Sequence, residues 1–344
     1  MTELISPAAP ESLILPSGEV QFGHFDGPVD SLGLAHFEYR NNMDKLASRW
    51  ARHFHFKQFQ FVSLLTPRYV IGVALADIGY VGSAFCYLYD IAANTLVETT
   101  WLKPLAKGMS MSPSPRQGKA FIGGRRGRIT FNLVDGLWQL SLDTPQISAE
   151  LELHPLALSL PMAMCTPTGY NGWTYTQKHN GLLPKGRLTI KHEPQPLNNA
   201  LASYDFSAGY MRRETSWRWA SINARVGDAI IGLNLAAGVN ETGATENVLW
   251  VNGARHLLGP VQFDFLRNSE HISDDYWRIT SLDGRVDLRF KARNCRQEKL
   301  NLWLLQSNFR QYIGHFEGEV IDGEGQQHHL QQVLGLTEDH FARW

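Results

Sequence analysis

Short runs of alternating apolar and polar residues, separated by Asp-Gly pairs, dominate this sequence. Asp135-Gly136 divides residues 128–142 into two such runs, and Asp283-Gly284 divides residues 277–290. An Asp-Gly pair supplies the positive φ angles that a tight hairpin turn requires. Strand-like segments do not alternate with long helical ones, as they do around a parallel sheet. The pattern therefore predicts an all-β fold of antiparallel strands, arranged as barrels or sandwiches.

Helices are expected to be few. Asn42 can cap a helix over Met43–His53, in which an apolar residue recurs every third or fourth position. A second, short helix is predicted to begin at Thr337. Asp77-Ile78-Gly79 is typical of a hairpin turn, and further strands are expected at residues 300–305 and 314–321.

The length of the chain indicates more than one core. A chain of 344 residues exceeds what one hydrophobic core usually serves, so two medium-sized domains or one large domain are expected. Residues 191–199 form a polar segment with two prolines, which disfavours a central strand and makes this segment the candidate linker. We predict an N-terminal barrel over residues 1–195, which begins with an irregular arm, and a C-terminal barrel over residues 196–344. The boundary can also lie somewhat further along the chain.

The charge balance limits the partners. The sequence has 32 basic and 33 acidic residues and a net charge of −1, so it lacks the basic surplus typical of nucleic-acid binding. No apolar run approaches the roughly 18 residues that span a membrane. Met1–Pro16 lacks the basic start and apolar run of a signal peptide. We expect a cytoplasmic protein with no nucleic-acid partner and no transmembrane segment, for which peripheral contact with a membrane stays open.

Signals for metals, cofactors and common catalytic motifs are absent. Cys86, Cys165 and Cys295 are scattered and form no C-x-x-C pair, so neither a zinc site nor a redox pair is indicated. The sequence also lacks the G-x-S-x-G elbow of many serine hydrolases and the G-x-x-x-x-G-K loop of many nucleotide-binding proteins. We expect no metal and no cofactor.

Aromatic and polar side chains gather between Thr166 and Trp250. In the segment TPTGYNGWTYTQK (166–178), Tyr170, Trp173 and Tyr175 alternate with small or polar residues. On a strand, Trp173 and Tyr175 would share one face, either as barrel core or as the wall of a pocket with the tyrosine hydroxyl turned toward a ligand. Aromatic surface with a few polar groups is what a pocket for a mostly apolar ligand requires.

A second aromatic segment contains the candidate catalytic group. Trp217 and Trp219 alternate with Arg218, so one face of a strand would be aromatic and the other cationic. Asp205 lies among aromatic residues, and a carboxylic acid in apolar surroundings can stay protonated and donate a proton. The alternative is an ion pair of Asp205 with Arg218 or Arg213 that only joins two strands. The other candidate ligand-binding residues are Asn234, Glu246, Asn247 and Trp250.

Several of these segments together resemble a known bacterial family. The resemblance rests on TPTGYNGWTYTQK, on SWRWAS (216–221), on the run GLNLAAGVNETGATEN (232–247) and on the terminal H-x-A-R-W (340–344). These segments are similar to the uncharacterised domain-of-unknown-function family 2804. The resemblance covers most of the chain after about residue 20.

More distantly, the chain resembles tandem lipocalin-like proteins, namely the AttH-like proteins and the carotenoid hydratases (hydroxyneurosporene synthases). These proteins carry a tyrosine-rich strand, a glycine-containing strand and a W-x-D-H-E-W signature, followed by an aromatic strand. Similar segments occur here in the same order, at residues 175–178, 186–189, 203–207 and 217–219. Asp205 matches the acidic part of the signature, whereas Phe206 and Ser207 stand where His and Glu would be.

The resemblance implies two lipocalin-like antiparallel β-barrels packed together. The first functional expectation is binding of an apolar or amphipathic small molecule, such as a lipid, isoprenoid or polyketide-like compound, in a barrel or between the barrels. The second is proton-transfer catalysis on such a ligand (hydration, isomerisation or cyclisation), with Asp205 as the acid. The third is an interaction protein with filled barrels. An apolar cavity open to solvent would distinguish the first two from the third.

Overall fold

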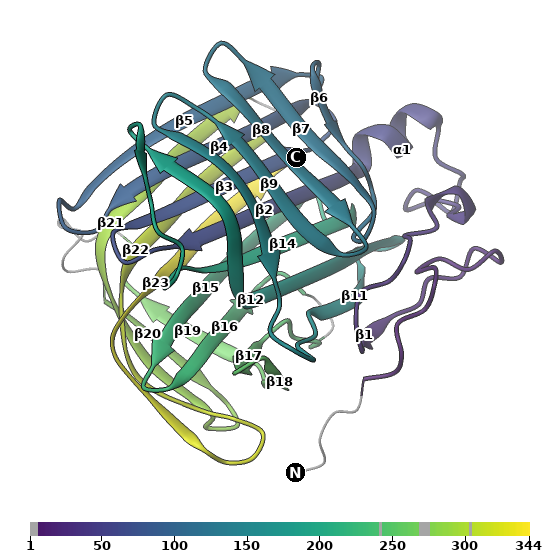
Figure 1. Ribbon diagram of the computed structural model, residues 1–344. Helices are drawn as coiled ribbons and strands as arrows, with labels where there is room; N and C mark the ends of the chain where they lie inside the picture. The colour runs from purple at the N-terminus through teal and green to yellow at the C-terminus, as the bar shows by residue number, and fades with distance from the viewer. Residues whose placement is uncertain (1–5, 241–242, 268–275, 303–304) are drawn as a thin grey trace. The chain divides into compact units, whose positions relative to one another are not determined.

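The computed structural model describes residues 6–240, 243–267, 276–302 and 305–344 (Figure 1). Within these residues, strands make up most of the chain. The helices are α1 (Arg49–His55) and the 3₁₀ helix η1 (Leu34–His36). The predicted all-β class with few helices is confirmed. No helix among the described residues is long and apolar enough to cross a membrane.

The described chain divides into two compact units. The N-terminal unit comprises Ser6–Pro155 and Pro161–Met211, and the C-terminal unit comprises Leu156–Leu160 and Arg212–Trp344. The segment 191–199, predicted as a linker, belongs to the N-terminal unit, where Glu193–Pro194 pairs with residues 189–190. Each unit has a sheet and a hydrophobic core of its own.

A fourteen-stranded antiparallel sheet builds the N-terminal unit and curls into a nearly closed barrel. Its main path runs β5-β4-β3-β2-β14-β12-β10-β9-β8-β7-β6, while β11 and β13 pair with β12, and β1 pairs with β11. The strands are β1 (Gly23–Phe25), β2 (Phe56–Leu65), β3 (Tyr69–Asp77), β4 (Val81–Asp90), β5 (Thr95–Pro104), β6 (Met109–Met111), β7 (Gly118–Gly124), β8 (Gly127–Val134), β9 (Leu137–Asp143), β10 (Ile147–His154), β11 (Met162–Thr168), β12 (Gly172–Ile190), β13 (Glu193–Pro194) and β14 (Leu201–Tyr210).

Period-two burial produces the core of this barrel. On β8, Ile129, Phe131 and Leu133 are buried while the residues between them are more exposed, and β9 and β10 repeat the pattern. The strand β12 serves two parts of the sheet, because its first half pairs with β14 and its second half with β10. The register shifts between these halves, where Gly181 has a φ of 74° that a larger side chain would rarely adopt.

A nine-stranded antiparallel sheet forms the C-terminal unit as a half-barrel, in the order β18-β17-β16-β15-β23-β22-β21-β20-β19. The three strands that come last in the sequence, β21, β22 and β23, have 17 residues each and form the long hairpins at the centre of the sheet. The strands are β15 (Glu214–Val226), β16 (Ala229–Ala237), β17 (Val248–Val251), β18 (Ala254–Leu257), β19 (Val261–Phe265), β20 (Tyr276–Ser281), β21 (Val286–Leu302), β22 (Leu305–Ile321) and β23 (Gln327–Arg343).

The predicted hairpin turns are confirmed. Asp135 and Gly136 have φ angles of 49° and 81° and join β8 to β9, as a tight turn with two positive φ angles requires. Residues 78–80 join β3 to β4. Residues 282–285 join β20 to β21, but in the pair Asp283-Gly284 only the glycine has a positive φ, of 71°, so this turn is wider than the predicted one. The predicted strand at residues 314–321 is the second half of β22. Of the predicted strand at 300–305, residues 300–302 end β21 and residue 305 begins β22, while residues 303–304 lie outside the described residues.

Both helix predictions need correction. The helix α1 begins at Arg49, not Met43, because the hydroxyl of Ser48 caps it by accepting from the N–H of Ala51 at 3.1 Å. No helix begins at Thr337, because β23 continues to Arg343 and pairs with β15 on one side and β22 on the other. Backbone pairing on both edges outweighs the local helical preference of this segment.

Candidate functional site

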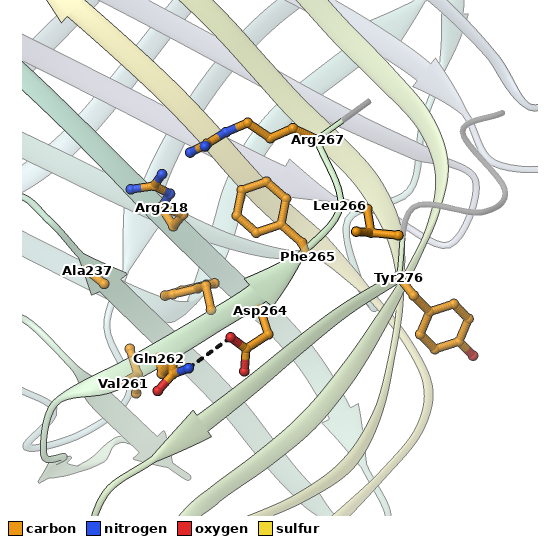
Figure 2. A pocket seen from close by; sticks show the side chains of 10 residues that line it. Arg218, Ala237, Val261, Gln262, Asp264, Phe265, Leu266, Arg267 and Tyr276 are labelled. Atoms are coloured by element: carbon orange, nitrogen blue, oxygen red, sulfur yellow. Dashed lines mark hydrogen bonds between the residues drawn. The ribbon is translucent and has the colours of Figure 1, made fainter. Parts of the chain in front are cut away.

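A pocket of about 780 Å³ opens in the C-terminal unit (Figure 2). Both apolar and charged side chains line it, and most come from β19 and the residues just after it. β15, β16 and the start of β20 supply the rest. The lining residues are Arg218, Ala237, Val261, Gln262, Phe263, Asp264, Phe265, Leu266, Arg267 and Tyr276.

The sheet topology explains the position of this pocket. β19 is the last strand of the sheet and is hydrogen-bonded along one edge to β20. Its other edge approaches β16 without a ladder of hydrogen bonds between them. Arg218 and Ala237 lie opposite each other on β15 and β16 and face this gap. The pocket therefore occupies the seam where the half-barrel does not close.

An aromatic wall forms one side of the seam. Phe263 and Phe265 alternate with polar residues on β19, so that both rings reach the buried indole of Trp277. Phe265 stacks on Trp277 with a centroid distance of 3.9 Å and an angle of 5°, and Phe263 meets it edge-on at 6.1 Å. On the opposite face of β19, Gln262 donates to Asp264 at 2.8 Å (Figure 2).

Arginines surround one buried carboxylate beside this wall. Arg267 donates to Asp339 through Nε at 2.9 Å and Nη2 at 3.1 Å, and Arg310 donates through Nη1 at 3.4 Å. Nε of Arg218 lies 3.4 Å from the same carboxylate. The Asp339 side chain is 6% exposed, whereas Arg218 is 26% and Arg267 is 47% exposed. Among the described residues, three guanidinium groups thus contact the carboxylate of Asp339, and the pocket lining adds one acidic side chain, Asp264. Three positive charges against two negative charges leave a local surplus of positive charge.

Two of these three arginines, Arg218 and Arg267, also contact the aromatic wall. The guanidinium carbons of Arg218 and Arg267 lie 5.9 Å and 5.3 Å from the centroid of Phe265, within cation–π range. Figure 2 shows both side chains near the Phe265 ring. The pocket therefore combines an apolar ring surface with cationic donors at one end.

The other candidate residues of the C-terminal unit form a hydrogen-bonded network. Trp219 donates through its indole N–H to Asn234 at 2.7 Å, and Asn234 donates to the carbonyl of Glu246 at 2.7 Å. Asn247 accepts from the N–H of Ala236 at 2.7 Å and donates to the carbonyl of Gly259 at 2.9 Å. This network ties residues 246–247 to β16 and does not line the pocket.

Trp217 and Trp250 also lie outside the pocket. Trp217 projects from the face of β15 opposite to Arg218, where its indole N–H donates to Glu338 at 2.7 Å. The Trp250 indole is buried and donates to the carbonyl of Leu160 at 2.9 Å.

In the N-terminal unit, Trp173 and Tyr175 are fully buried in the core. The hydroxyl of Tyr175 donates to Gln177 at 3.0 Å and accepts from the N–H of Val29 at 3.3 Å. Tyr170 is 64% exposed, and its hydroxyl donates to Asp44 at 3.2 Å.

Asp205 forms an ion pair with Lys178, the residue directly opposite on β12. Lys178 donates to one carboxylate oxygen of Asp205, and the hydroxyl of Ser207 donates to the other at 3.2 Å. The ion-pair partner differs from the expected Arg218 or Arg213, because Arg218 lies against Asp339. Asp205 therefore acts as a hydrogen-bond acceptor in this arrangement.

Sequence reasoning found Arg218 but missed most of the pocket. Phe263 and Phe265 alternate with polar residues, and this period-two pattern could have marked a half-buried strand. Arg267, Arg310 and Asp339 carried no local signal, because their contact depends on which strands pair and in what register.

Comparison with known proteins places the chain in a family. A family model matches residues 8–344, nearly the whole chain. The chain belongs to DUF2804, a family of domains of unknown function. This membership confirms the resemblance seen in the sequence. A search of curated proteins gives no match to this member of DUF2804.

Solved structures of the same fold extend the comparison. The structure of CghA with Sch210972 matches with a TM-score of 0.56 and 10% identity, covering 87% of this chain and 90% of CghA. Kievitone hydratase from Nectria haematococca matches with a TM-score of 0.51 and 11% identity, covering 84% and 88%. A putative AttH protein from Nitrosomonas europaea has a TM-score of 0.47 and 14% identity, covering 84% and 93%. The first two matches show that this DUF2804 protein shares their fold, with two lipocalin-like barrel units.

Proposed function

We propose that this protein binds an amphipathic small molecule with an anionic group, in the pocket at the open seam of the C-terminal unit. One observation carries the proposal: Arg218, Arg267 and Arg310 share the single carboxylate of Asp339 beside the rings of Phe263 and Phe265. The surplus of positive charge favours an anionic group, and the rings offer contact to an apolar body.

The geometry suits a carboxylate or phosphate head. Arg267 uses two donors on Asp339, and the partly exposed guanidinium groups of Arg267 and Arg218 can each direct further N–H groups to a ligand. The planar guanidinium group pairs well with carboxylates and phosphates, and it stacks on aromatic rings. The pocket volume of about 780 Å³ lies within the range that drug-sized ligands occupy. Fatty acids, isoprenoid acids and acidic polyketide-like compounds combine these two features.

The comparison with CghA supports this class of function, because that protein of the same fold was solved with the small molecule Sch210972. The proton-transfer alternative draws support from the name of kievitone hydratase. That alternative requires Asp205 to donate a proton, whereas Lys178 and Ser207 both donate to it here. Binding without turnover therefore accounts better for the geometry of this chain.

A matched pair of probes tests the proposal. The fluorescent fatty acid cis-parinaric acid and its methyl ester have the same apolar body, and only the acid has a charge. We expect the wild-type protein to bind the acid at least about tenfold more tightly than the ester, because a charge-assisted hydrogen bond contributes roughly 1.5–3 kcal/mol. Arg267→Met should remove this preference, whereas Phe265→Ala should weaken binding of both probes.

The control is Arg225→Met, which removes an exposed arginine that lies seven residues from Arg218 along β15 and outside the pocket lining. It should leave both affinities unchanged. Equal affinity of the wild-type protein for acid and ester would contradict the anionic part of the proposal. Unchanged binding in both Arg267→Met and Phe265→Ala would show that the probe binds elsewhere.

A further inference from the structure

A row of aromatic rings lies on the surface of the N-terminal unit, where α1 meets the turn between β3 and β4. Trp50 and Phe54 of α1 lie 6.1 Å apart with nearly parallel rings at 14°. Phe54 then stacks on Tyr80 of the turn at 4.5 Å and 9°. Figure 1 shows α1 at the start of β2, outside the sheet. Because the three rings stack nearly parallel to one another, each ring limits the orientation of its neighbour.

The two end rings of this row are open to solvent, and Phe54 between them is partly buried. Trp50 is 74% exposed and Tyr80 is 39% exposed. Two further apolar side chains of these segments are exposed: Leu46, which precedes α1 and forms a β-bridge with Arg40, at 56%, and Leu105, whose N–H donates to the carbonyl of Tyr80, at 55%. Single exposed apolar side chains are ordinary, but a contiguous set on one surface indicates a binding surface. We name Leu46, Trp50, Phe54, Tyr80 and Leu105 the α1 surface.

Basic side chains flank the α1 surface. Lys45 and Arg49 are exposed beside Leu46 and Trp50, and Arg52 lies on the same helix. No acidic residue occurs between positions 45 and 76, although the whole chain has a net charge of −1. Residues 44–52 contain three basic side chains and one acidic side chain, Asp44, so this segment has an excess of positive charge. At the turn, Asp77 interacts electrostatically with Lys57.

The chemistry of the α1 surface matches the surface of an anionic bilayer. Tryptophan and tyrosine favour the membrane–water interface, because one part of each ring system is apolar and the other can form hydrogen bonds. Lys and Arg side chains beside Trp and Leu are also typical of segments that bind at that interface, although here Lys45 and Leu46 precede α1 and only Arg49 and Trp50 belong to it. Cationic side chains at its edge are attracted by anionic lipid headgroups.

We propose that the α1 surface docks this protein on membranes that contain anionic phospholipid. Trp50, Leu46 and Leu105 enter the interfacial region, and Lys45 and Arg49 contact the lipid headgroups. The proposal stands apart from the ligand pocket, since the α1 surface belongs to the N-terminal unit and the pocket to the C-terminal unit.

Co-sedimentation with vesicles tests the proposal on the full chain. The protein should bind vesicles of phosphatidylcholine mixed with phosphatidylserine and bind vesicles of pure phosphatidylcholine far more weakly. Higher salt should weaken the binding, because ions screen the attraction between exposed charges. Trp50→Ser should lower the partition coefficient between vesicles and water roughly tenfold, because less apolar area enters the bilayer interface. Lys45→Glu with Arg49→Glu should lower it at least about 25-fold, since each basic residue near an anionic surface contributes about fivefold.

Matched controls separate docking from general changes in hydrophobicity or charge. Leu158 is 99% exposed outside the α1 surface, and Leu158→Ser removes a similar apolar group. Arg125→Glu with Arg225→Glu changes the net charge by the same amount at two exposed sites elsewhere. Both controls should bind the mixed vesicles like the wild type. Because the substituted side chains of the α1 surface are exposed, circular dichroism should show that every variant folds.

Three results would overturn the proposal. The first is a wild-type protein that binds neither kind of vesicle. The second is unchanged binding of the mixed vesicles by both α1-surface variants, which would place the contact elsewhere. The third is a wild-type dimer that Trp50→Ser converts to a monomer without any change in vesicle binding, since this would assign the α1 surface to a second copy of the chain.

Discussion

The ion pair between Lys178 and Asp205 provides a sharp test of whether Asp205 is structural or catalytic. The two residues lie directly opposite each other on β12 and β14, and their side chains are 8% and 13% exposed. A neighbouring pair supports them, because the hydroxyls of Thr176 and Ser207 are hydrogen-bonded at 3.0 Å. Asp205→Asn keeps the shape of the side chain but removes the charge that faces the ammonium group of Lys178.

The burial of the pair sets the expected magnitude. Removal of one partner from a buried ion pair costs roughly 3–5 kcal/mol, because the other charge loses its compensation. Both side chains keep a small exposure, so we expect the lower end, about 3 kcal/mol. This value corresponds to a fall of roughly 6–12 °C in the melting temperature of a unit of this size. Replacement of both residues, as in Lys178→Met with Asp205→Leu, should recover most of the loss, because no buried charge remains.

Urea unfolding followed by circular dichroism measures the free energies for the wild type, Asp205→Asn and the double variant. Asp143→Asn is the control: Asp143 pairs with Arg128 at 3.3 Å, but both side chains are more than half exposed. It should cost less than about 1 kcal/mol. The structural interpretation fails if Asp205→Asn costs no more than this control. If that variant also stops the conversion of a compound that the wild type transforms, Asp205 is the catalytic acid.

Three further substitutions test how a buried histidine and two glycines contribute to the stability of the two units. Burial, with a contribution from Arg296, lowers the pKa of His340 to about 3 from its ordinary value of 6.5, so stability should fall as the pH drops from 6.5 toward 3. The unfolded chain then binds a proton that the folded chain excludes, and the loss should reach about 2 kcal/mol at pH 5 and be absent in His340→Gln, as urea unfolding at pH 7 and pH 5 would show. Gly72→Ala should cost about 1–3 kcal/mol, because the new Cβ would lie 2.3 Å from the ring of Tyr87, and an equally stable variant would contradict the packing. Gly124→Ala is its control, since that Cβ meets nothing nearer than 3.6 Å. Gly136→Ala should lower the unfolding free energy by about 1 kcal/mol, because Gly136 has a φ of 81°, and no change would refute the role of the turn.

The fold class was readable from the sequence because its signals are local. A turn such as Asp135-Gly136 needs positive φ angles whatever surrounds it, and Gly supplies them without steric cost. The alternation on β8 and β9 likewise records which residues are buried. These signals, together with the family resemblance, were enough to predict antiparallel barrels.

Where the predicted secondary structure was wrong, specific hydrogen bonds determined the structure that forms instead. The helix near Trp50 was predicted from Met43, but Asn41 accepts from the N–H groups of Met43 and Lys45 and holds this stretch in a turn. Ser48 then supplies the cap from which α1 can start. The sequence predicts a helix that starts at Thr337, yet this residue is completely buried in the middle of a sheet, opposite Tyr312 on β22.

The pocket was harder to predict than the fold, because its parts are distant in sequence. Asp339 meets Arg310 across 29 residues and Arg267 across 72, and each contact requires the long hairpins to pair in one register. The aromatic content of residues 166–178 marks Trp173 and Tyr175 as candidates, but the sequence does not distinguish a ring that fills a core from one that faces an open seam. Arg218 could be selected because it alternates with two tryptophans, and this alternation assigns its side chain to one face of β15.

The pairing register of β23 also explains why a carboxylate lies among the arginines of the seam. A shift of one residue on β23 would turn Asp339 to the opposite face and present Glu338 in its place. Glu338 accepts from Trp217 and Gln311 on its own face, so the two acidic residues serve different faces of one sheet. Pairing of β23 on both edges prevents such a shift, and it holds the carboxylate of Asp339 beneath the arginines. β23, which occupies the segment predicted as a helix, therefore positions the carboxylate of Asp339 at the proposed binding site.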